Sequence, residues 1–214
     1  MKRILLFLSG LFIFALGTSV SITANLGISP VSSLPYVLSM ITKIDQGIMQ
    51  MAIFLIFIVL QLIILKKDFK KEDLIQVPVA LASGLVLTFW NTILGNYRPE
   101  SYILRFATLL VSIFLISIGV AMMITSRFSP APPDAFCIAV SKKTNIPVHK
   151  VKNVLDVSFV AFSSILTFLI LGKVVGIREG TVISALSIGP VLGILKPKVE
   201  KMFFHAEKLS KDIK

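Results

Sequence analysis

Six apolar runs of about twenty residues each divide this chain, and they constrain its fold more than any other feature. The runs cover residues 4–24, 47–65, 75–95, 103–125, 153–172 and 179–195. A helix needs about 20 apolar residues to cross the hydrocarbon core of a bilayer. The composition agrees, because 55% of the residues are apolar and only 15% are charged, whereas soluble domains need a charged surface. The sequence therefore predicts an all-α polytopic membrane protein with about six transmembrane helices.

The net charge of +11 comes from lysines and arginines at the ends of the apolar runs. A nucleic-acid-binding protein would gather them on one solvated face, so we expect no nucleic-acid partner. Basic residues mark cytoplasmic loops. With the N-terminus inside and six crossings, seventeen of the twenty-two basic residues are cytoplasmic, and the other five are Lys43, Arg98, Arg105, Lys173 and Arg178. We therefore expect both termini in the cytoplasm.

The chain also repeats itself at an offset of 102 residues. This offset aligns Gly17 with Gly119, Thr23 with Thr125 and Pro30 with Pro132. Each half contains three crossings, so the second half enters the membrane from the opposite side, as in the inverted repeats of secondary transporters. We predict a first membrane repeat at 1–98, a second, inverted repeat at 99–197, and a basic amphipathic cytoplasmic tail at 198–214.

A short segment follows the first crossing of each half, at 31–42 and 133–144. Both are too short to span a bilayer, and both follow a proline, which favours a helix start. We therefore expect two short re-entrant or interfacial helices. Non-helical chain before them is tolerated in a membrane only where protein or water surrounds it, and inward-pointing helix N-termini would attract an anion or a carboxylate. The alternative is that these residues make tight turns at the membrane surface.

The re-entrant interpretation predicts substrate contacts from both halves. In the first half they are Thr23, Asn25, Gly27, Ser29, Pro30, Ser32 and Ser33, and in the second half Thr125, Ser126, Arg127, Pro132 and Asp134. Ionisable residues within a span usually face the protein interior. Asp156, with Asn153 one turn before it, is the candidate for ion coupling. The alternative for Asp156 is a pairing with Lys150 or Lys152 at the end of the span.

Other polar and small residues within the spans have structural interpretations. Gln50 and Gln61 are expected to form hydrogen bonds between helices, and the G-x-x-x-G spacing of Gly189 and Gly193 predicts close helix packing. Cys137 is expected to be a small buried residue, since it has no companion at a metal-ligand spacing. The sequence predicts no metal, no cofactor and no catalytic residues, because Asp134 and Asp156 lack the spacing of an intramembrane aspartyl protease and Cys137 has no nearby base.

The motifs ANLGISPVSSLPYVLS (24–39), SRFSPAPPDAFCIAVS (126–141) and REGTVISALSIGPVLG (178–193) are similar to the bacterial YczE/YyaS/YitT family of multipass integral membrane proteins. The similarity covers nearly the whole chain. Members often carry a tryptophan and an aspartate after the first proline, where this chain has Val31 and Ser32 and keeps an aspartate only at Asp134. The resemblance implies the bacterial plasma membrane and gives little information about a substrate.

These observations predict a small secondary transporter or facilitator, with a site near the membrane midplane between the two repeats that favours a small anionic or zwitterionic solute. The expected partners are membrane lipid and this solute. The sequence also leaves open whether the protein forms a homo-oligomer. The alternative function is a non-transporting membrane partner that supports assembly or secretion of another complex. Its signature would be a small-residue or polar face directed toward lipid.

Overall fold

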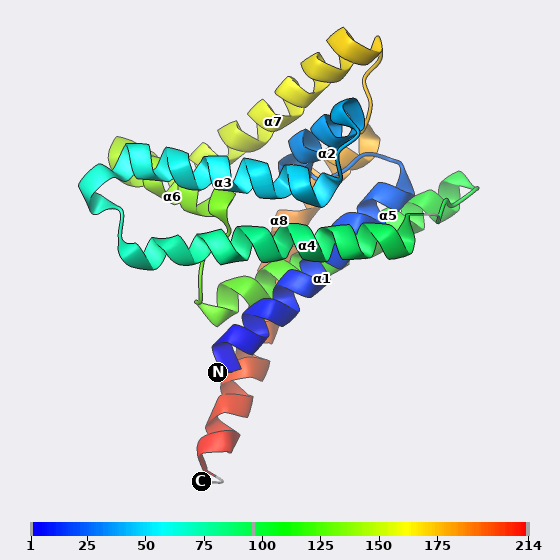
Figure 1. Cartoon of the computed structure of the whole chain (residues 1–214). Coiled ribbons are helices and arrows are strands. Elements are labelled where there is room, and N and C mark those ends of the chain that lie inside the picture. The colour runs from blue at the N-terminus through cyan, green and yellow to red at the C-terminus, as the bar shows by residue number, and fades with distance from the viewer. Residues whose placement is uncertain (1, 96, 213–214) are drawn as a thin grey trace.

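The fold is a bundle of eight α-helices with no strand in the part of the chain that the structure describes (Figure 1). The computed structural model describes residues 2–95 and 97–212, and the side chains of these residues up to Phe204. The helices are α1 (Lys2–Ala24), α2 (Pro30–Thr42), α3 (Gln46–Leu65), α4 (Gln76–Leu94), α5 (Tyr102–Ser126), α6 (Pro132–Thr144), α7 (Val148–Leu171) and α8 (Glu179–Asp212). Two short 3₁₀ turns, Lys66–Asp68 and Lys71–Ile75, connect α3 to α4.

Six of these helices are long and apolar enough to span a membrane, namely α1, α3, α4, α5, α7 and α8. They coincide with the six predicted runs, so the prediction of a multipass helical membrane protein is confirmed. The short helices α2 and α6 each begin one residue before the predicted segment, at Pro30 and Pro132. Proline starts a helix readily because its missing N–H would have no intrahelical partner there.

Helices α1–α4 and helices α5–α8 form two series of four. The chain turns at equivalent positions in the two series. Asn25 and Arg127, which follow α1 and α5, have φ values of 53° and 51°. Lys43 and Asn145, which follow α2 and α6, have φ values of 62° and 57°. A left-handed residue is a common way to end a helix, and in both pairs it recurs at the 102-residue offset seen in the sequence.

Helices α1 and α5 cross in an antiparallel pair at the centre of the bundle. At one end of the pair the rings of Phe7 and Phe128 lie 5.1 Å apart, and at the other Ala24 packs with Leu109. Gly10 and Gly119 permit the close approach, because a Cβ on either glycine would lie 2.8 Å from the carbonyl oxygen of the other. The crossing therefore depends on backbone-to-backbone contact.

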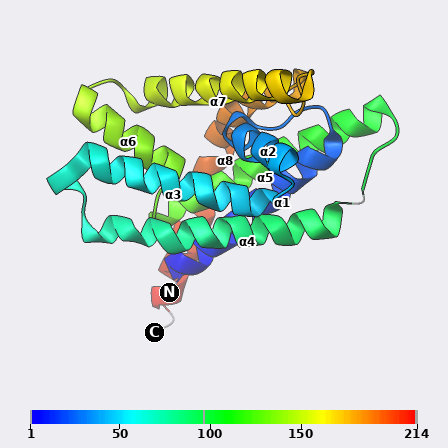
Figure 2. The ribbon, with the colours of Figure 1, turned by 45° about the horizontal axis from the view of Figure 1, so that its top comes forward.

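A second group of helices packs beside this pair, with α2 against α7 and α3 against α6. Its core contains Phe57 and Phe159, which lie at the 102-residue offset and have ring centroids 5.7 Å apart. Phe136 of α6 also packs on Phe57, at 5.0 Å. In Figure 2, α3 and α7 run along the two sides of this group, with α2 and α6 between them.

Buried glutamines connect the helices, as the sequence predicted. The side-chain amides of Gln61 and Gln76 bond each other reciprocally at 3.1 Å, which joins α3 to α4. Gln61 Nε2 also donates to the carbonyl oxygen of Pro132 at 3.1 Å, and Gln50 donates to Ser83 at 3.4 Å. Cys137 is fully buried and forms no disulfide, also as predicted.

The last helices of the two series pack differently. Helix α4 packs against both α1 and α3, whereas α8 packs mainly against α5 and not along α7 within the described residues. Gly189 and Gly193 of α8 have nothing within 4 Å of an added Cβ. Their G-x-x-x-G spacing therefore meets no other helix of the chain among the described residues, and close packing against another molecule stays a prediction. The predicted tail at 198–214 begins within α8, which continues as a helix to Asp212 (Figure 1).

Candidate functional site

The first helix break, residues 25–29, begins at the exposed Asn25 and is then embedded in protein. Leu26, Gly27, Ile28 and Ser29 are all buried. Two backbone hydrogen bonds connect this break to the chain that leads into α8, because Gly180 N–H donates to Leu26 O at 2.7 Å and Ile28 N–H donates to Gly176 O at 3.2 Å. These bonds pair the carbonyl of Leu26 and the N–H of Ile28, which are not paired within a helix. Non-helical chain inside a membrane requires such partners.

Gly27 and Asn25 take part in this contact. Gly27 has a φ of 107°, and a Cβ at this position would lie 2.5 Å from Thr181 Oγ1 and 2.9 Å from Arg178 N. Arg178 donates from its guanidinium to the carbonyl oxygen of Asn25 at 3.1 Å. Both predicted site residues therefore form part of the junction between the first break and α8.

The three predicted serines near the start of α2 bond mainly to one another and to α7. Ser29 Oγ donates to Ser32 Oγ at 3.1 Å, and Ser33 Oγ donates to Pro30 O at 2.7 Å. Ser163 of α7 in turn donates to Ser33 Oγ at 3.3 Å. All of these groups are buried, so the serines connect α2 to α7 inside the bundle.

The second break, residues 127–131, packs near the start of α1. Phe128 contacts Phe7, and its N–H donates to Ser126 Oγ at 3.2 Å. Thr125 is also buried, and its hydroxyl has no partner among the described residues. Arg127 is exposed.

The two breaks lie near opposite ends of the α1–α5 pair. Leu26 packs near Leu109, in the first half of α5, whereas the second break follows Ser126 at its end. The rise of 1.5 Å per residue puts roughly 25 Å between Leu109 and Ser126. The structure therefore places the two sets of predicted residues apart rather than around one volume.

The predicted acidic residues of the second half lie where α6 meets α7. Lys152 Nζ forms an ion pair with Asp134 Oδ1 at 2.7 Å, with both side chains close to half exposed. Asp156 follows Lys152 by one turn on α7, and its Oδ1 is buried without a partner among the described residues. Asn153 is exposed. Lys152 thus pairs with Asp134 and not with Asp156.

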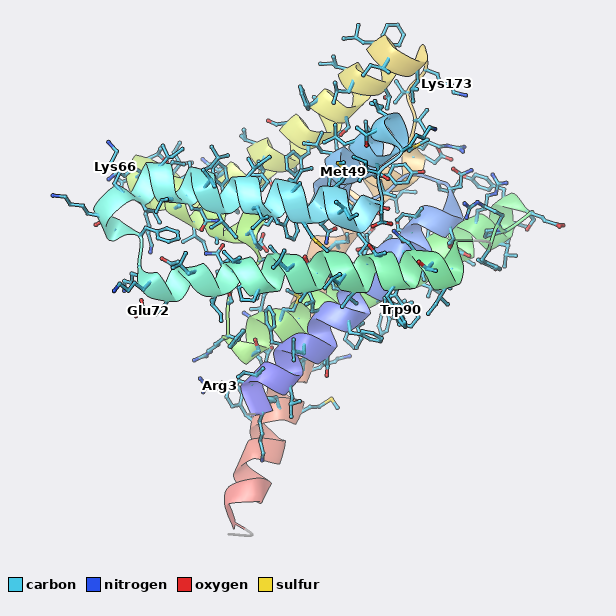
Figure 3. All side chains as sticks on the ribbon, in the orientation of Figure 1. Arg3, Met49, Lys66, Glu72, Trp90 and Lys173 are labelled. Atoms are coloured by element: carbon cyan, nitrogen blue, oxygen red, sulfur yellow. The ribbon has the colours of Figure 1, made fainter. Side chains whose placement is uncertain are left out.

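A cleft of about 370 Å³ with a mixed polar and apolar lining opens next to the first break, and we call it the Lys43–Arg98 cleft. It lies where the end of α1, the α2–α3 turn and the end of α4 meet. In Figure 3 this end of the bundle carries the labels Met49 and Trp90, and the labels Lys66 and Glu72 mark the opposite ends of α3 and α4. The lining residues are Ser19, Ile22, Thr23, Ser39, Lys43, Ile44, Asp45, Gln46, Asn91, Gly95 and Arg98.

Asp45 holds the α2–α3 turn against α4. Its carboxylate accepts hydrogen bonds from the N–H groups of Gly47 at 2.8 Å and Ile48 at 3.3 Å, and from the hydroxyl of Thr88. A carboxylate at the first turn of a helix is also favoured by the helix dipole. Gly47 then lies directly against the backbone of Gly84. This wall of the cleft is therefore fixed by both packing and hydrogen bonds.

Two residues that line the cleft, Ser19 and Gln46, carry buried polar atoms that lack partners in the part of the chain that the structure describes. Asn91 donates to Gln46 Oε1 at 3.2 Å, but Gln46 Nε2 and Ser19 Oγ have no partner among the described residues. Gln46 is 5% exposed and Ser19 is 1% exposed. An unpaired buried donor costs about 1–3 kcal/mol.

The charge of the cleft favours a negatively charged or zwitterionic guest. Lys43 and Arg98 line it as cations, and neither forms an ion pair within the part of the chain that the structure describes. Asp45 is the one acidic residue among the lining residues. The cleft therefore combines two cations, one carboxylate and several neutral hydrogen-bonding groups.

Only Thr23 of the predicted site residues lines this cleft. The sequence analysis placed Lys43 and Arg98 among the loop charges and did not single out Ser19, Gln46 or Asn91 as site residues. These residues come from separate segments that only the folded chain brings together. The described residues also contain no group of three His, Cys, Asp or Glu side chains placed to hold a metal ion.

In a comparison with protein families, residues 1–197 match DUF6198, a family of unknown function. A search of curated proteins and a search of solved structures each gave no match. With a described fold of eight helices, six of them long enough to span a membrane, and a family match over most of its length, the chain belongs to the DUF6198 family.

Proposed function

We propose that this protein is a small secondary transporter or facilitator, built from two inverted halves, that takes up a small anionic or zwitterionic solute through the Lys43–Arg98 cleft. The observation that carries the proposal is the cleft itself, which is lined by two cations together with Ser19 and Gln46, two residues with unpartnered polar atoms. Solute sites in proteins usually combine a concave surface with a few polar groups that fix orientation.

Reciprocal contacts across the α1–α5 crossing support the inverted arrangement. A Cβ added to Gly17 would lie 2.7 Å from Ile116 N, and one added to Gly119 would lie 2.6 Å from Phe14 N. Because Gly17 corresponds to Gly119 and Phe14 to Ile116 at the 102-residue offset, exchanging the halves reproduces the contact. An axis in the membrane plane relates two antiparallel helices in this way.

The hydrophobic clusters around the two breaks are also reproduced when the two halves are exchanged at the 102-residue offset. Leu26 packs with Leu109 and Ile113, and the equivalent residue Phe128 packs with Phe7 and Leu11. Each break thus packs beside the other long helix, about two turns from that helix's end, and has protein around it. This burial supports the re-entrant interpretation of α2 and α6 over the interfacial one, because irregular chain inside a membrane needs protein around it.

Charge supports an orientation with both termini in the cytoplasm. Lys143, at the end of α6, lies 3.8 Å from Asp68 in the α3–α4 connection, so these two basic segments share one end of the bundle. Basic segments remain on the cytoplasmic side. The cleft, at the other end of α3 and α4, would then open outward. Together with the family resemblance, this supports a bacterial plasma membrane protein.

The unequal packing of α4 and α8 supports a transport cycle. Inverted-repeat transporters alternate between two arrangements by moving one element against another. Here α4 packs on α3, whereas α8 does not pack along α7. We expect the second arrangement to bring α8 toward α7 and to release α4 from α3.

The test has two steps. A thermal-shift screen of the purified protein with small carboxylates, amino acids and inorganic phosphate selects a solute, and proteoliposomes then measure uptake of that solute in radiolabelled form. We expect saturable uptake that falls at least tenfold in Gln46→Leu and in Arg98→Gln. Lys173→Gln, which changes a basic residue outside the cleft, is the matched control. Equal uptake in all four proteins would refute the cleft as the entry site, and no uptake of any stabilising solute would refute transport.

A second function, that of a non-transporting membrane partner, is supported by the open surface of α8. Gly189 and Gly193 are exposed on this helix and approach no other residue. Purification from native membranes in mild detergent distinguishes the two functions. A stoichiometric partner that is lost in Gly193→Leu, combined with absent uptake, would favour the partner function.

A further inference from the structure

We propose that the basic end of the bundle binds the phosphate group of an anionic phospholipid, in a pocket between the α3–α4 connection and the end of α6. The pocket has a volume of about 470 Å³ and is lined by Leu65, Lys67, Asp68, Lys70, Lys142 and Lys143. It lies far from the Lys43–Arg98 cleft and does not depend on transport.

The charge of the pocket matches a phosphate. Four lysines line it against one aspartate, and Asp68 is already paired with Lys143 at 3.8 Å. The other three lysines form no ion pair among the described residues. Lysine clusters next to the end of a membrane span attract anionic headgroups, and each basic residue contributes about 1 kcal/mol near such a surface.

Packing of Phe69 holds one side of the pocket, and an exposed ion pair joins it to α6. Phe69, between Asp68 and Lys70, packs against the cluster that contains Phe57 and Phe159. The ion pair between Lys143 and Asp68 then joins the connection to α6. The lysines are therefore presented by an anchored turn and a helix end.

An apolar surface continues from the pocket along the span, which favours a lipid over a free phosphate ion. Leu65 lines the pocket, and Leu62 and Val59 precede it on α3 at intervals of three residues. Leu62 is 51% exposed and Val59 is 54% exposed. Residues three apart are neighbours on a helix surface, so Leu65, Leu62 and Val59 form a row that winds gradually around α3. A phosphate in the pocket would thus place its acyl chains against this surface.

Native mass spectrometry of the full-length protein in detergent tests the proposal, with phosphatidylglycerol and phosphatidylcholine of identical acyl chains as probes. We expect wild-type protein to bind phosphatidylglycerol at least about tenfold more tightly than phosphatidylcholine. The triple variant Lys67→Gln, Lys70→Gln and Lys142→Gln should lose this preference, and it leaves the Lys143 and Asp68 pair intact. The matched control neutralises Lys196, Lys198 and Lys201 on α8, which changes the net charge equally, and should keep the preference.

Three results would overturn the proposal. Equal binding of phosphatidylglycerol and phosphatidylcholine by wild-type protein would overturn the proposal directly. Retained preference in the folded triple variant, checked by circular dichroism and size-exclusion chromatography, would place the lipid elsewhere. Displacement of phosphatidylglycerol by millimolar inorganic phosphate would assign the pocket to a free anion instead.

Discussion

Gly10 and Gly119 face each other where α1 crosses α5, and each glycine leaves room for the carbonyl oxygen of the other. A Cβ on either would lie 2.8 Å from that oxygen. Because both neighbours are backbone atoms, neither helix has a side chain that can rotate away. The contact therefore sets the distance between the two central helices.

Substitution of Gly119 by leucine should destabilise the protein strongly. Overpacking of a close contact costs about 1–3 kcal/mol, and more where nothing can rearrange. We expect a lower midpoint of thermal unfolding in detergent, measured by tryptophan fluorescence. Gly193→Leu introduces the same side chain where no atom lies within 4 Å, and should unfold like wild type. Equal midpoints for the two variants would contradict the crossing.

The break at residues 25–29 predicts a difference between two glycines with positive φ. Gly27 (φ 107°) packs against Thr181, whereas Gly172 (φ 68°) has nothing within 4 Å of an added Cβ. Alanine at Gly172 should cost about 1–2 kcal/mol from backbone strain alone. Alanine at Gly27 should cost more, because steric overlap adds to the strain. A detergent denaturation series measures both, and a larger loss at Gly172 would argue against the junction with α8.

The buried glutamine pair should behave as a unit. Gln61→Ala removes the partner of Gln76 and of the Pro132 carbonyl, so it should cost about 1–3 kcal/mol in unfolding free energy. Replacing both glutamines by leucine should restore part of this loss, since two apolar groups leave fewer unpaired amides. A double-mutant cycle measures the coupling. Additive losses would show that the two amides are not in contact.

The contact between α2 and α7 predicts a disulfide crosslink. Ser33 and Ser163 have their hydroxyl oxygens 3.3 Å apart. In a Cys137→Ala background, Ser33→Cys with Ser163→Cys should oxidise readily, and cleavage at a protease site placed between α4 and α5 should leave the halves joined. Ser33→Cys with Ser164→Cys is the control, because the neighbouring position lies on another side of α7. Crosslinking of both pairs to the same extent would argue against the packing.

Cysteine labelling in intact cells tests the orientation. In the Cys137→Ala background, Lys43→Cys and Arg98→Cys should react with an impermeant maleimide from outside. Lys70→Cys and Lys142→Cys should react only after the cells are opened. The native Cys137 has no exposed surface and should react only after denaturation. The reverse pattern would invert the proposed topology.

The spans and the short helices were accessible to prediction because their signals are local. An apolar run of about twenty residues and a proline at a helix start act within the segment itself, and α2 and α6 each begin one residue from the predicted position. The bonding role of Gln61 was also predictable, since a buried amide within a span needs a partner. The sequence did not identify that partner as Gln76.

The Lys43–Arg98 cleft was not predictable, because its residues come from three separate parts of the chain and none carries a motif. Lys43 and Arg98 look like ordinary loop charges until the fold brings them together. Gly189 and Gly193 differ, because they carry a recognised G-x-x-x-G spacing but contact no other helix among the described residues. Small residues permit close contact, but they do not determine whether another helix arrives there.

The hydrogen bonds between the first break and the chain before α8 have a consequence for biogenesis. Leu26 and Ile28 obtain their backbone partners from Gly180 and Gly176, which the ribosome adds about 150 residues later. Until that segment emerges, the turn after the first span has two polar backbone groups without their final partners, a costly state in lipid. We therefore expect nascent chains that end before α8 to be recognised by membrane quality-control proteases, although they already contain five of the six spans.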